Sequence, residues 1–157
     1  MFYFFKNRLF DKTKKQTFLA NQIIKRIIKM SKVATALKSA NETKSLIIGQ
    51  DVLKQTFKLF KEQFPGRKAI VVADHNTYLI AGETIVKQFE SNHIEQESAF
   101  VYKDPELYAE YKYVEQLVAA LELHHAIPIA VGSGTINDLT KLAAHLTNRP
   151  YMCVATA

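Results

Sequence analysis

The sequence predicts a doubly wound α/β domain with a mostly parallel β-sheet. Two observations support this prediction. From Ser31 onward, short apolar runs alternate with longer segments of helical periodicity, which is the pattern of repeated βαβ units. One of these runs, Lys68–Ala73, is apolar after its first residue, as expected for a strand covered on both faces of a parallel sheet. With 157 residues, the chain is long enough for one such domain with a substantial core.

Helices are expected where apolar residues recur at three- and four-residue intervals. In chain order, these segments are Ser31–Ala40, Asp51–Phe64, Asn76 to about Glu90, Asp104 to about His124, and Thr135–Leu146. Local signals set their boundaries. Pro65 and Gly66 end the second helix, Asn76 can cap the third, and Pro105 suits the first turn of the fourth.

Strands are expected at the short apolar runs between these helices. In chain order, they are Ser45–Ile48, Lys68–Ala73, Glu97–Tyr102, Ile127–Val131 and Tyr151–Ala155. Because helices separate the strands, they should run mostly parallel, in a Rossmann-like sheet with helices on both faces. Sheets of this kind bind ligands beyond the carboxyl ends of their strands.

The net charge of +6 is distributed unevenly along the chain. Residues 1–29 contain eight Lys and Arg and one Asp, whereas the 128 residues after them carry thirteen bases and fourteen acids. We therefore divide the chain into a basic leader, residues 1–29, that is an amphipathic helix or disordered, and an α/β domain, residues 30–157. Because the excess of bases lies in the leader, no nucleic-acid partner is expected for the domain.

The leader has apolar residues at roughly helical spacing, namely Phe18, Ile23, Ile24, Ile27 and Ile28. A basic amphipathic helix of this kind can bind a membrane surface or direct a protein to an organelle. We favour the simpler interpretation of an accessory extension, or of a start upstream of a natural one at Met30. Membrane contact by the leader is therefore not expected.

The single cysteine, Cys153, excludes a disulfide framework and is typical of a reducing, cytoplasmic location. Its place in an apolar strand predicts a buried thiol and not a nucleophile. The five histidines do not have the spacing of metal ligands. We therefore expect neither a metal site nor a catalytic residue in this chain.

Small or polar residues follow three of the expected strands, at Asp74–Asn76, at Gly132–Thr135 and at Thr156. In a parallel sheet, these segments should converge on one edge. The loop Gly132-Ser133-Gly134 can cradle a phosphate, because its N–H groups can approach an anion and the dipole of the following helix favours negative charge. The same glycines are equally compatible with a tight strand-to-helix turn.

Two acidic residues near these loops also have two interpretations. Asp138 lies off the apolar stripe of its helix, so it can face a ligand, or it can complete a capping box that begins at Thr135. Asp74 can accept hydrogen bonds from a ribose diol, or it can form a turn or cap before the next helix. Spacing alone does not separate these alternatives.

The stretches VVADHNTYLIAG (71–82) and AVGSGTINDLTKLAAHLTNRPYMCVATA (130–157) resemble the N-terminal part of sn-glycerol-1-phosphate dehydrogenases. These enzymes share a superfamily with glycerol dehydrogenase, iron-containing alcohol dehydrogenases and 3-dehydroquinate synthase. The resemblance extends more loosely over Met30–Ala157. The superfamily's commoner loop is G-G-G-S-x-x-D, so Ser133 and Thr135 favour the glycerol-1-phosphate branch.

The resemblance implies a metal-dependent oxidoreductase that uses NAD(P), with Asp74 holding the adenosine ribose. It implies that Gly132 and Ser133 shape the cofactor turn, and that Thr156 begins a further segment in contact with the cofactor. The residues implied for the pyrophosphate and the nicotinamide are Gly134, Thr135, Ile136, Asn137 and Asp138.

In the family, NAD(P)H reduces dihydroxyacetone phosphate to sn-glycerol 1-phosphate, and a second, helical domain supplies an Asp and two His ligands for zinc or nickel. The sequence is truncated before that domain, so we expect a cofactor-binding portion that is inactive alone. Two alternatives remain open, a non-catalytic nucleotide-binding module and a fragment of a glycerol dehydrogenase or 3-dehydroquinate synthase relative. A homo-oligomer is compatible with each of them.

Overall fold

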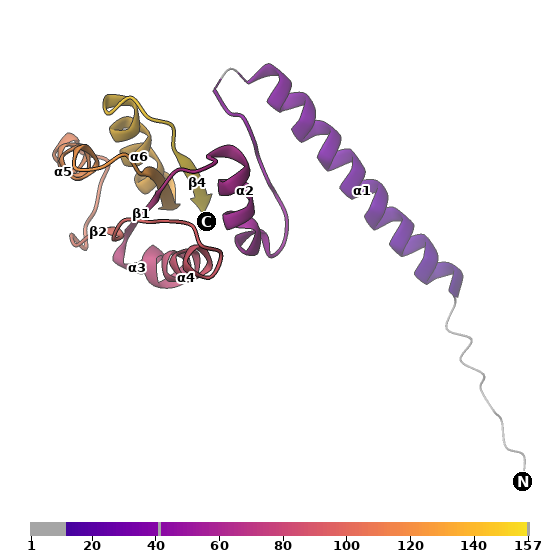
Figure 1. Cartoon of the computed structure of the whole chain (residues 1–157). Coiled ribbons are helices and arrows are strands. Elements are labelled where there is room, and N and C mark those ends of the chain that lie inside the picture. The colour runs from indigo at the N-terminus through magenta and orange to yellow at the C-terminus, as the bar shows by residue number, and fades with distance from the viewer. Residues whose placement is uncertain (1–11, 41, 157) are drawn as a thin grey trace, which may run out of the picture. The chain divides into compact units, whose positions relative to one another are not determined.

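The computed structural model describes residues 12–40 and 42–156, and the chain divides into two compact units between Ile47 and Ile48. The first unit contains one helix, α1 (Lys12–Ser39), and the second contains the sheet and the other helices (Figure 1). Because the two units are separate bodies, each is described by itself.

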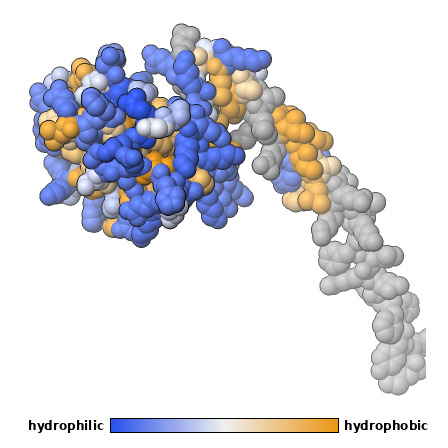
Figure 2. All heavy atoms as spheres, viewed as in Figure 1, coloured by the Kyte–Doolittle hydropathy of each residue, from blue (hydrophilic) through white to orange (hydrophobic). Residues whose placement is uncertain are grey.

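Helix α1 is much longer than the short helix expected from Ser31. It runs without interruption for 28 residues through Met30, so the predicted division after residue 29 falls inside it. Figure 2 shows hydrophobic residues of this helix gathered in one patch. The division into a leader and a domain remains a prediction.

The strand expected at Ser45–Ile48 is absent, and this prediction was wrong. Leu46, Ile47 and Ile48 are exposed instead, by 46%, 39% and 52%. An apolar run becomes a strand only where its N–H and C=O groups find a neighbouring strand, and no described strand pairs with this segment. The apolar composition of this run therefore predicted a strand, but its backbone groups have no described strand to pair with.

The second unit is built on four parallel strands in the order β2-β1-β3-β4. They are β1 (Ala69–Asp74), β2 (Phe100–Tyr102), β3 (Ile127–Gly132) and β4 (Met152–Ala155). The two central strands are β1 and β3, paired from Ala69 opposite Ile127 to Val72 opposite Ala130. The prediction of a doubly wound, parallel α/β sheet is confirmed.

The helices alternate with the strands, as expected. They are the 3-10 turn η1 (Val52–Gln55), α2 (Thr56–Gln63), α3 (His75–Thr77), the π-helical turn η2 (Tyr78–Gly82), α4 (Glu83–Ser91), α5 (Tyr111–Glu122) and α6 (Gly134–Leu146). Helix α5 begins seven residues later than predicted, because the Asp104 carboxylate accepts hydrogen bonds from the amide of Glu106 and the hydroxyl of Tyr113. These bonds hold a turn where the sequence suggested a helix start.

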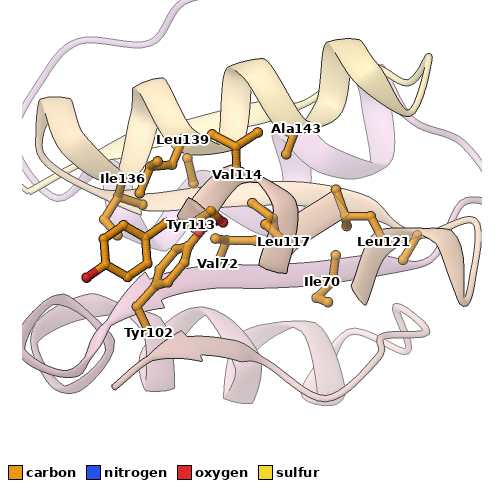
Figure 3. Close-up of a cluster of buried hydrophobic side chains, with 12 residues drawn as sticks. Ile70, Val72, Tyr102, Tyr113, Val114, Leu117, Leu121, Ile136, Leu139 and Ala143 are labelled. Carbon is orange, nitrogen blue, oxygen red and sulfur yellow. Dashed lines mark hydrogen bonds between the residues drawn. The ribbon is translucent and has the colours of Figure 1, made fainter. Parts of the chain in front are cut away.

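Alternate side chains of the central strands point to opposite faces of the sheet, and both faces are buried. On one face, Ile70 and Val72 of β1 pack with residues of α5 and α6, such as Leu117 and Leu139 (Figure 3). The other face packs against α2, η2 and α4 and includes Phe60, Val71, Ile85, Phe89 and Ile129. This two-sided burial explains why β1 and β3 read as continuous apolar runs.

Edge strand β4 departs from that pattern, since its residues alternate between half-buried and exposed. Cys153 lies on this strand and is exposed, so the prediction of a buried thiol was wrong. The cause is its position at the sheet edge, which an apolar sequence run does not reveal. Separately, no helix of the described residues is both long and apolar enough to cross a membrane.

Candidate functional site

The three predicted ligand-binding segments lie at the carboxyl ends of parallel strands. Asp74 is the last residue of β1, Gly132 is the last residue of β3, and Thr156 follows β4. The last two meet directly, because the Thr156 amide donates a 3.1 Å hydrogen bond to the Gly132 carbonyl. The structure therefore brings the glycine loop and Thr156 together at the sheet edge where parallel α/β domains bind ligands.

Asp74 caps helix α3. Its Oδ1 accepts a 2.8 Å hydrogen bond from the amide of Thr77, and the hydroxyl of Thr77 accepts a 3.2 Å bond from the Asp74 amide. The reciprocal pair is a capping box, which satisfies two backbone donors at the helix start. The expectation that Asn76 caps this helix was wrong, and the cap interpretation of Asp74 is confirmed. The capping bond uses Oδ1, so a further ligand contact by this carboxylate remains a prediction.

Sequence reasoning missed the π-helical turn η2 that follows this cap. Gly82 ends the turn, and a Cβ at Gly82 would lie 2.6 Å from Cδ2 of the Tyr78 ring. The glycine thus makes room for an aromatic ring one turn earlier in the helix. Single π turns inside helices occur frequently beside functional sites. An isolated glycine within an apolar helical pattern was the available signal.

The two loop glycines have different structural roles. A Cβ at Gly132 would lie 2.8 Å from both Cβ and Cγ1 of Ile136, so this glycine allows α6 to approach the end of β3. A Cβ at Gly134 would meet no heavy atom within 4 Å. The space beside Gly134 is therefore open, at the first residue of α6.

The N-terminus of α6 is not capped by a side chain. Ser133 is the N-cap residue, with φ −92° and ψ −162°, and its hydroxyl makes no capping hydrogen bond. The first helical bond runs from the amide of Asn137 to the carbonyl of Ser133. The capping box from Thr135 to Asp138, one of the two alternatives left open for Asp138, does not form, because Thr135 already lies inside the helix. An uncapped helix start with open space beside it suits a phosphate group.

The next residues of α6 lie in different environments, some in the core and some at the surface. The side chain of Ile136 is 1% exposed and belongs to the core, so it can offer a ligand only its backbone amide. Asn137 is held by Tyr151, whose hydroxyl donates a 3.2 Å bond to Asn137 Oδ1. Asp138 is exposed, as expected from its position off the buried stripe, and Asn137 Nδ2 lies 3.4 Å from its Oδ1.

The described residues do not form a metal site. Across residues 12–40 and 42–156, no three His, Cys, Asp or Glu side chains come together in an arrangement that could hold a metal ion. The described residues therefore do not supply ligands for the zinc or nickel that the resemblance implies for the whole enzyme. The glycine loop does fit a phosphate-bearing cofactor, since Gly134 leaves the start of α6 open.

A parallel sheet with a glycine-containing turn leading into a helix at its carboxyl edge defines a domain of the doubly wound, Rossmann-like α/β class. The family model described as "Iron-containing alcohol dehydrogenase" matches residues 47–157. The chain belongs to this family.

Two curated relatives are glycerol-1-phosphate dehydrogenases of the NAD(P)+ type. The protein from Halalkalibacterium halodurans is 32% identical over 89 residues, which cover 55% of this chain and 22% of the relative. The protein from Thermoplasma volcanium is 29% identical over 114 residues, covering 73% of this chain and 31% of the relative. The chain thus spans less than a third of the length of either relative.

Solved structures with the same fold are less similar in sequence. Glycerol dehydrogenase from Schizosaccharomyces pombe has a TM-score of 0.55 and 21% identity, with 67% of this chain and 26% of that chain covered. Maleylacetate reductase from Rhizobium sp. strain MTP-10005 has a TM-score of 0.57 and 17% identity, with coverages of 74% and 32%. A 2-epi-5-epi-valiolone synthase from Streptomyces hygroscopicus, solved with NAD+ and Zn2+ bound, has a TM-score of 0.51 and 21% identity, with coverages of 74% and 33%.

Proposed function

We propose that this chain is the NAD(P)-binding portion of an oxidoreductase that interconverts dihydroxyacetone phosphate and sn-glycerol 1-phosphate. The observation that carries the proposal is the open, uncapped start of α6 at Gly134. The names of the two curated relatives support the choice of cofactor and substrate.

In this proposal, the first-turn amides of α6 bind the pyrophosphate of the cofactor. The N-terminal amides of a helix have no intrahelical acceptor, and the helix dipole adds positive potential at the same place. Gly134 keeps this surface clear, while Gly132 sets the distance between the helix and the sheet. Asp138, exposed on the first turns of α6, is available to the nicotinamide end.

Asp74 and Thr156 complete the proposed site at the ends of the neighbouring strands. The Asp74 carboxylate would accept hydrogen bonds from the diol of the adenosine ribose while keeping its cap on α3. Thr156, held by its bond to Gly132, would extend the contact surface past β4. Bound NAD(P)H would supply the hydride for carbonyl reduction, and these residues would bind and orient it.

The experiment that tests the site is a calorimetric titration with NADH. In Gly134→Val, the added side chain occupies the space that a phosphate needs, and its Cβ atom meets no heavy atom of the protein within 4 Å. We expect the affinity to fall at least about tenfold, because hydrogen bonds to a charged phosphate contribute roughly 1.5–3 kcal/mol each.

The matched control is His145→Val, which places the same side chain at an exposed position near the other end of α6. This variant should bind NADH as the wild type does. Equal affinities of the wild type and Gly134→Val would contradict the proposed cradle, and so would a wild type that gives no heat of binding at millimolar NADH.

We further propose that the 157-residue chain does not by itself reduce dihydroxyacetone phosphate. It corresponds to 22% and 31% of the two curated relatives, and its described residues do not fit the implied metal ion. Purified chain should leave NADH absorbance unchanged in the presence of dihydroxyacetone phosphate and added Zn2+ or Ni2+. Steady oxidation of NADH at ordinary enzyme rates, about one turnover per second or faster, would contradict this expectation.

A further inference from the structure

Helix α1 carries several exposed, large aliphatic side chains on one face. With 100° of rotation per residue, Leu19, Ile23, Ile24 and Ile27 fall on one half of the helix. Their side chains are 52%, 58%, 52% and 59% exposed. An exposed group of large aliphatic side chains of this kind indicates a binding surface.

The same helix carries a strongly positive charge. Between Lys12 and Ser39 there are eight Lys and Arg residues, without a single Asp or Glu. Six of these bases occupy helical positions on the half opposite the apolar face: Lys14, Lys15, Lys25, Arg26, Lys29 and Lys32. The other two, Lys12 and Lys38, lie at the two ends of the helix, so α1 as a whole is basic and amphipathic.

The continuity of α1 changes the expectation drawn from the sequence. If the helix ended with the predicted leader at residue 29, its apolar face would be short. The helix continues to Ser39 instead. Met30, Ala34 and Leu37 fall on the same half as Ile27, so the apolar face extends for several further turns. At about 1.5 Å per residue, the helix is roughly 40 Å long.

Charge decides which partner suits this face. Two copies of α1 packed through their apolar halves would leave the outward-facing bases of both helices without an acidic partner, because α1 contains no Asp or Glu. A nucleic acid would match the charge but would leave the aliphatic face in water. An anionic bilayer surface matches both, because lipid phosphates attract the bases while the acyl boundary accepts the aliphatic side chains.

We propose that α1 binds the surface of anionic lipid membranes. The helix lies in the plane of the interface, with Ile23, Ile24 and Ile27 directed toward the acyl chains and its bases beside the headgroups. This inference does not depend on the cofactor site, which belongs to the other compact unit. It replaces the sequence-based expectation that residues 1–29 make no membrane contact.

The test is co-sedimentation of the full 157-residue chain with large vesicles, using Ile27→Glu as the variant and Gln22→Glu as its matched control. Both substitutions change the charge equally and lie five residues apart, but Gln22 is an exposed residue on the polar half of the helix. A second variant, Ile24→Ser, weakens the apolar face without changing the charge. Far-ultraviolet circular dichroism establishes that each variant retains its helix.

We expect the wild type to bind phosphatidylcholine vesicles that contain about 30% phosphatidylglycerol at least about tenfold more tightly than pure phosphatidylcholine vesicles. Ile27→Glu should lower the partition coefficient about tenfold or more, whereas Gln22→Glu should lower it no more than about threefold. Ile24→Ser should lower it by an intermediate factor.

Several results would overturn the proposal. If Ile27→Glu and Gln22→Glu lowered the partition coefficient equally, charge alone would drive binding. The apolar face would then have no role, and a nucleic acid would suit α1 equally well. A lipid-free dimer that dissociates in Ile27→Glu would identify a second copy of the chain as the partner. No sedimentation of the wild type with anionic vesicles would exclude the lipid surface itself.

Discussion

A Cβ atom at Gly132 would lie 2.8 Å from Cβ and Cγ1 of Ile136, which are the atoms of that side chain closest to its backbone. Such a contact cannot be relieved by rotation of a distant methyl group, so strand and helix must separate. We expect Gly132→Ala to lower the free energy of unfolding by about 1–3 kcal/mol, as is usual for overpacking in a core. Urea denaturation measures this change.

Gly134→Ala is the matched comparison for that substitution. It adds the same methyl group two residues later, where no heavy atom lies within 4 Å. Its free energy of unfolding should differ from that of the wild type by less than about 0.5 kcal/mol. Equal destabilisation by the two substitutions would show that backbone conformation, and not contact with Ile136, requires glycine at residue 132.

Arg149 ties the end of α5 to the start of β3. Its guanidinium donates 3.0 Å hydrogen bonds to the carbonyls of Leu121, His124 and Ala126. We expect Arg149→Ala to cost about 2–3 kcal/mol of stability, because it leaves carbonyls at a helix end without their donor. Arg149→Lys should recover only part of this loss, since an ammonium cannot reproduce the planar fork of donors. Thermal unfolding with calorimetry measures both.

The control for Arg149 is Arg67→Ala. Arg67 is exposed and donates one 3.0 Å bond to the carbonyl of His125, in the same turn. This substitution should cost less than about 1 kcal/mol. A similar cost for the two arginines would mean that general charge in this turn, and not the three-carbonyl contact of Arg149, stabilises the fold.

The buried elements were the predictable part of the fold. Strands β1 and β3 lie between two layers of helices, so their apolar runs in the sequence coincide with their structural bounds to within two residues. Helix α6 was also predicted to within one residue, because Gly134 begins it and its buried stripe includes Ile136, Leu139 and Ala143. In these elements local pattern and tertiary packing agree.

The errors occurred where a distant partner decides the structure. The apolar run at Ser45–Ile48 needs a neighbouring strand that local composition cannot reveal. The start of α5 depends on Tyr113, nine residues beyond the Asp104 carboxylate that it binds. At the candidate site, the resemblance supplied the residues, but the different roles of Gly132 and Gly134 depend on their three-dimensional neighbours.

The bond between Tyr113 and Asp104 predicts a dependence of stability on acid. The Tyr113 hydroxyl, together with the amide of Glu106, holds the pKa of the Asp104 carboxyl below its usual value. Because the folded state lowers this pKa, the contribution of the carboxylate to stability is complete above about pH 4, the pKa in the unfolded chain. It is lost as the pH falls from there through the lower pKa of the folded state.

Tyr113→Phe removes the main cause of that shift. We expect the pKa of Asp104 to rise toward its ordinary value, as followed by the chemical shift of its carboxyl carbon during an acid titration. The decline in stability as the pH falls below about 4 should also become shallower. Tyr111→Phe, at a 60% exposed tyrosine of the same helix, should leave the Asp104 titration unchanged. An unchanged titration in Tyr113→Phe would contradict the assignment of the shift to the tyrosine hydroxyl.

Asp74 offers a way to separate its cap from its proposed contact with a ribose. Asn is as good an N-cap residue as Asp, so Asp74→Asn should preserve the bond to the Thr77 amide and change stability by less than about 0.5 kcal/mol. Asp74→Ala removes the cap and should cost about 1 kcal/mol. If the carboxylate also binds the ribose diol, both variants should weaken NADH binding at least about fivefold, because hydrogen bonds to a charged acceptor are the stronger ones. Calorimetric titration combined with urea denaturation measures the two effects on the same samples. Wild-type NADH affinity in Asp74→Asn, with stability retained, would restrict Asp74 to its structural role at the start of α3.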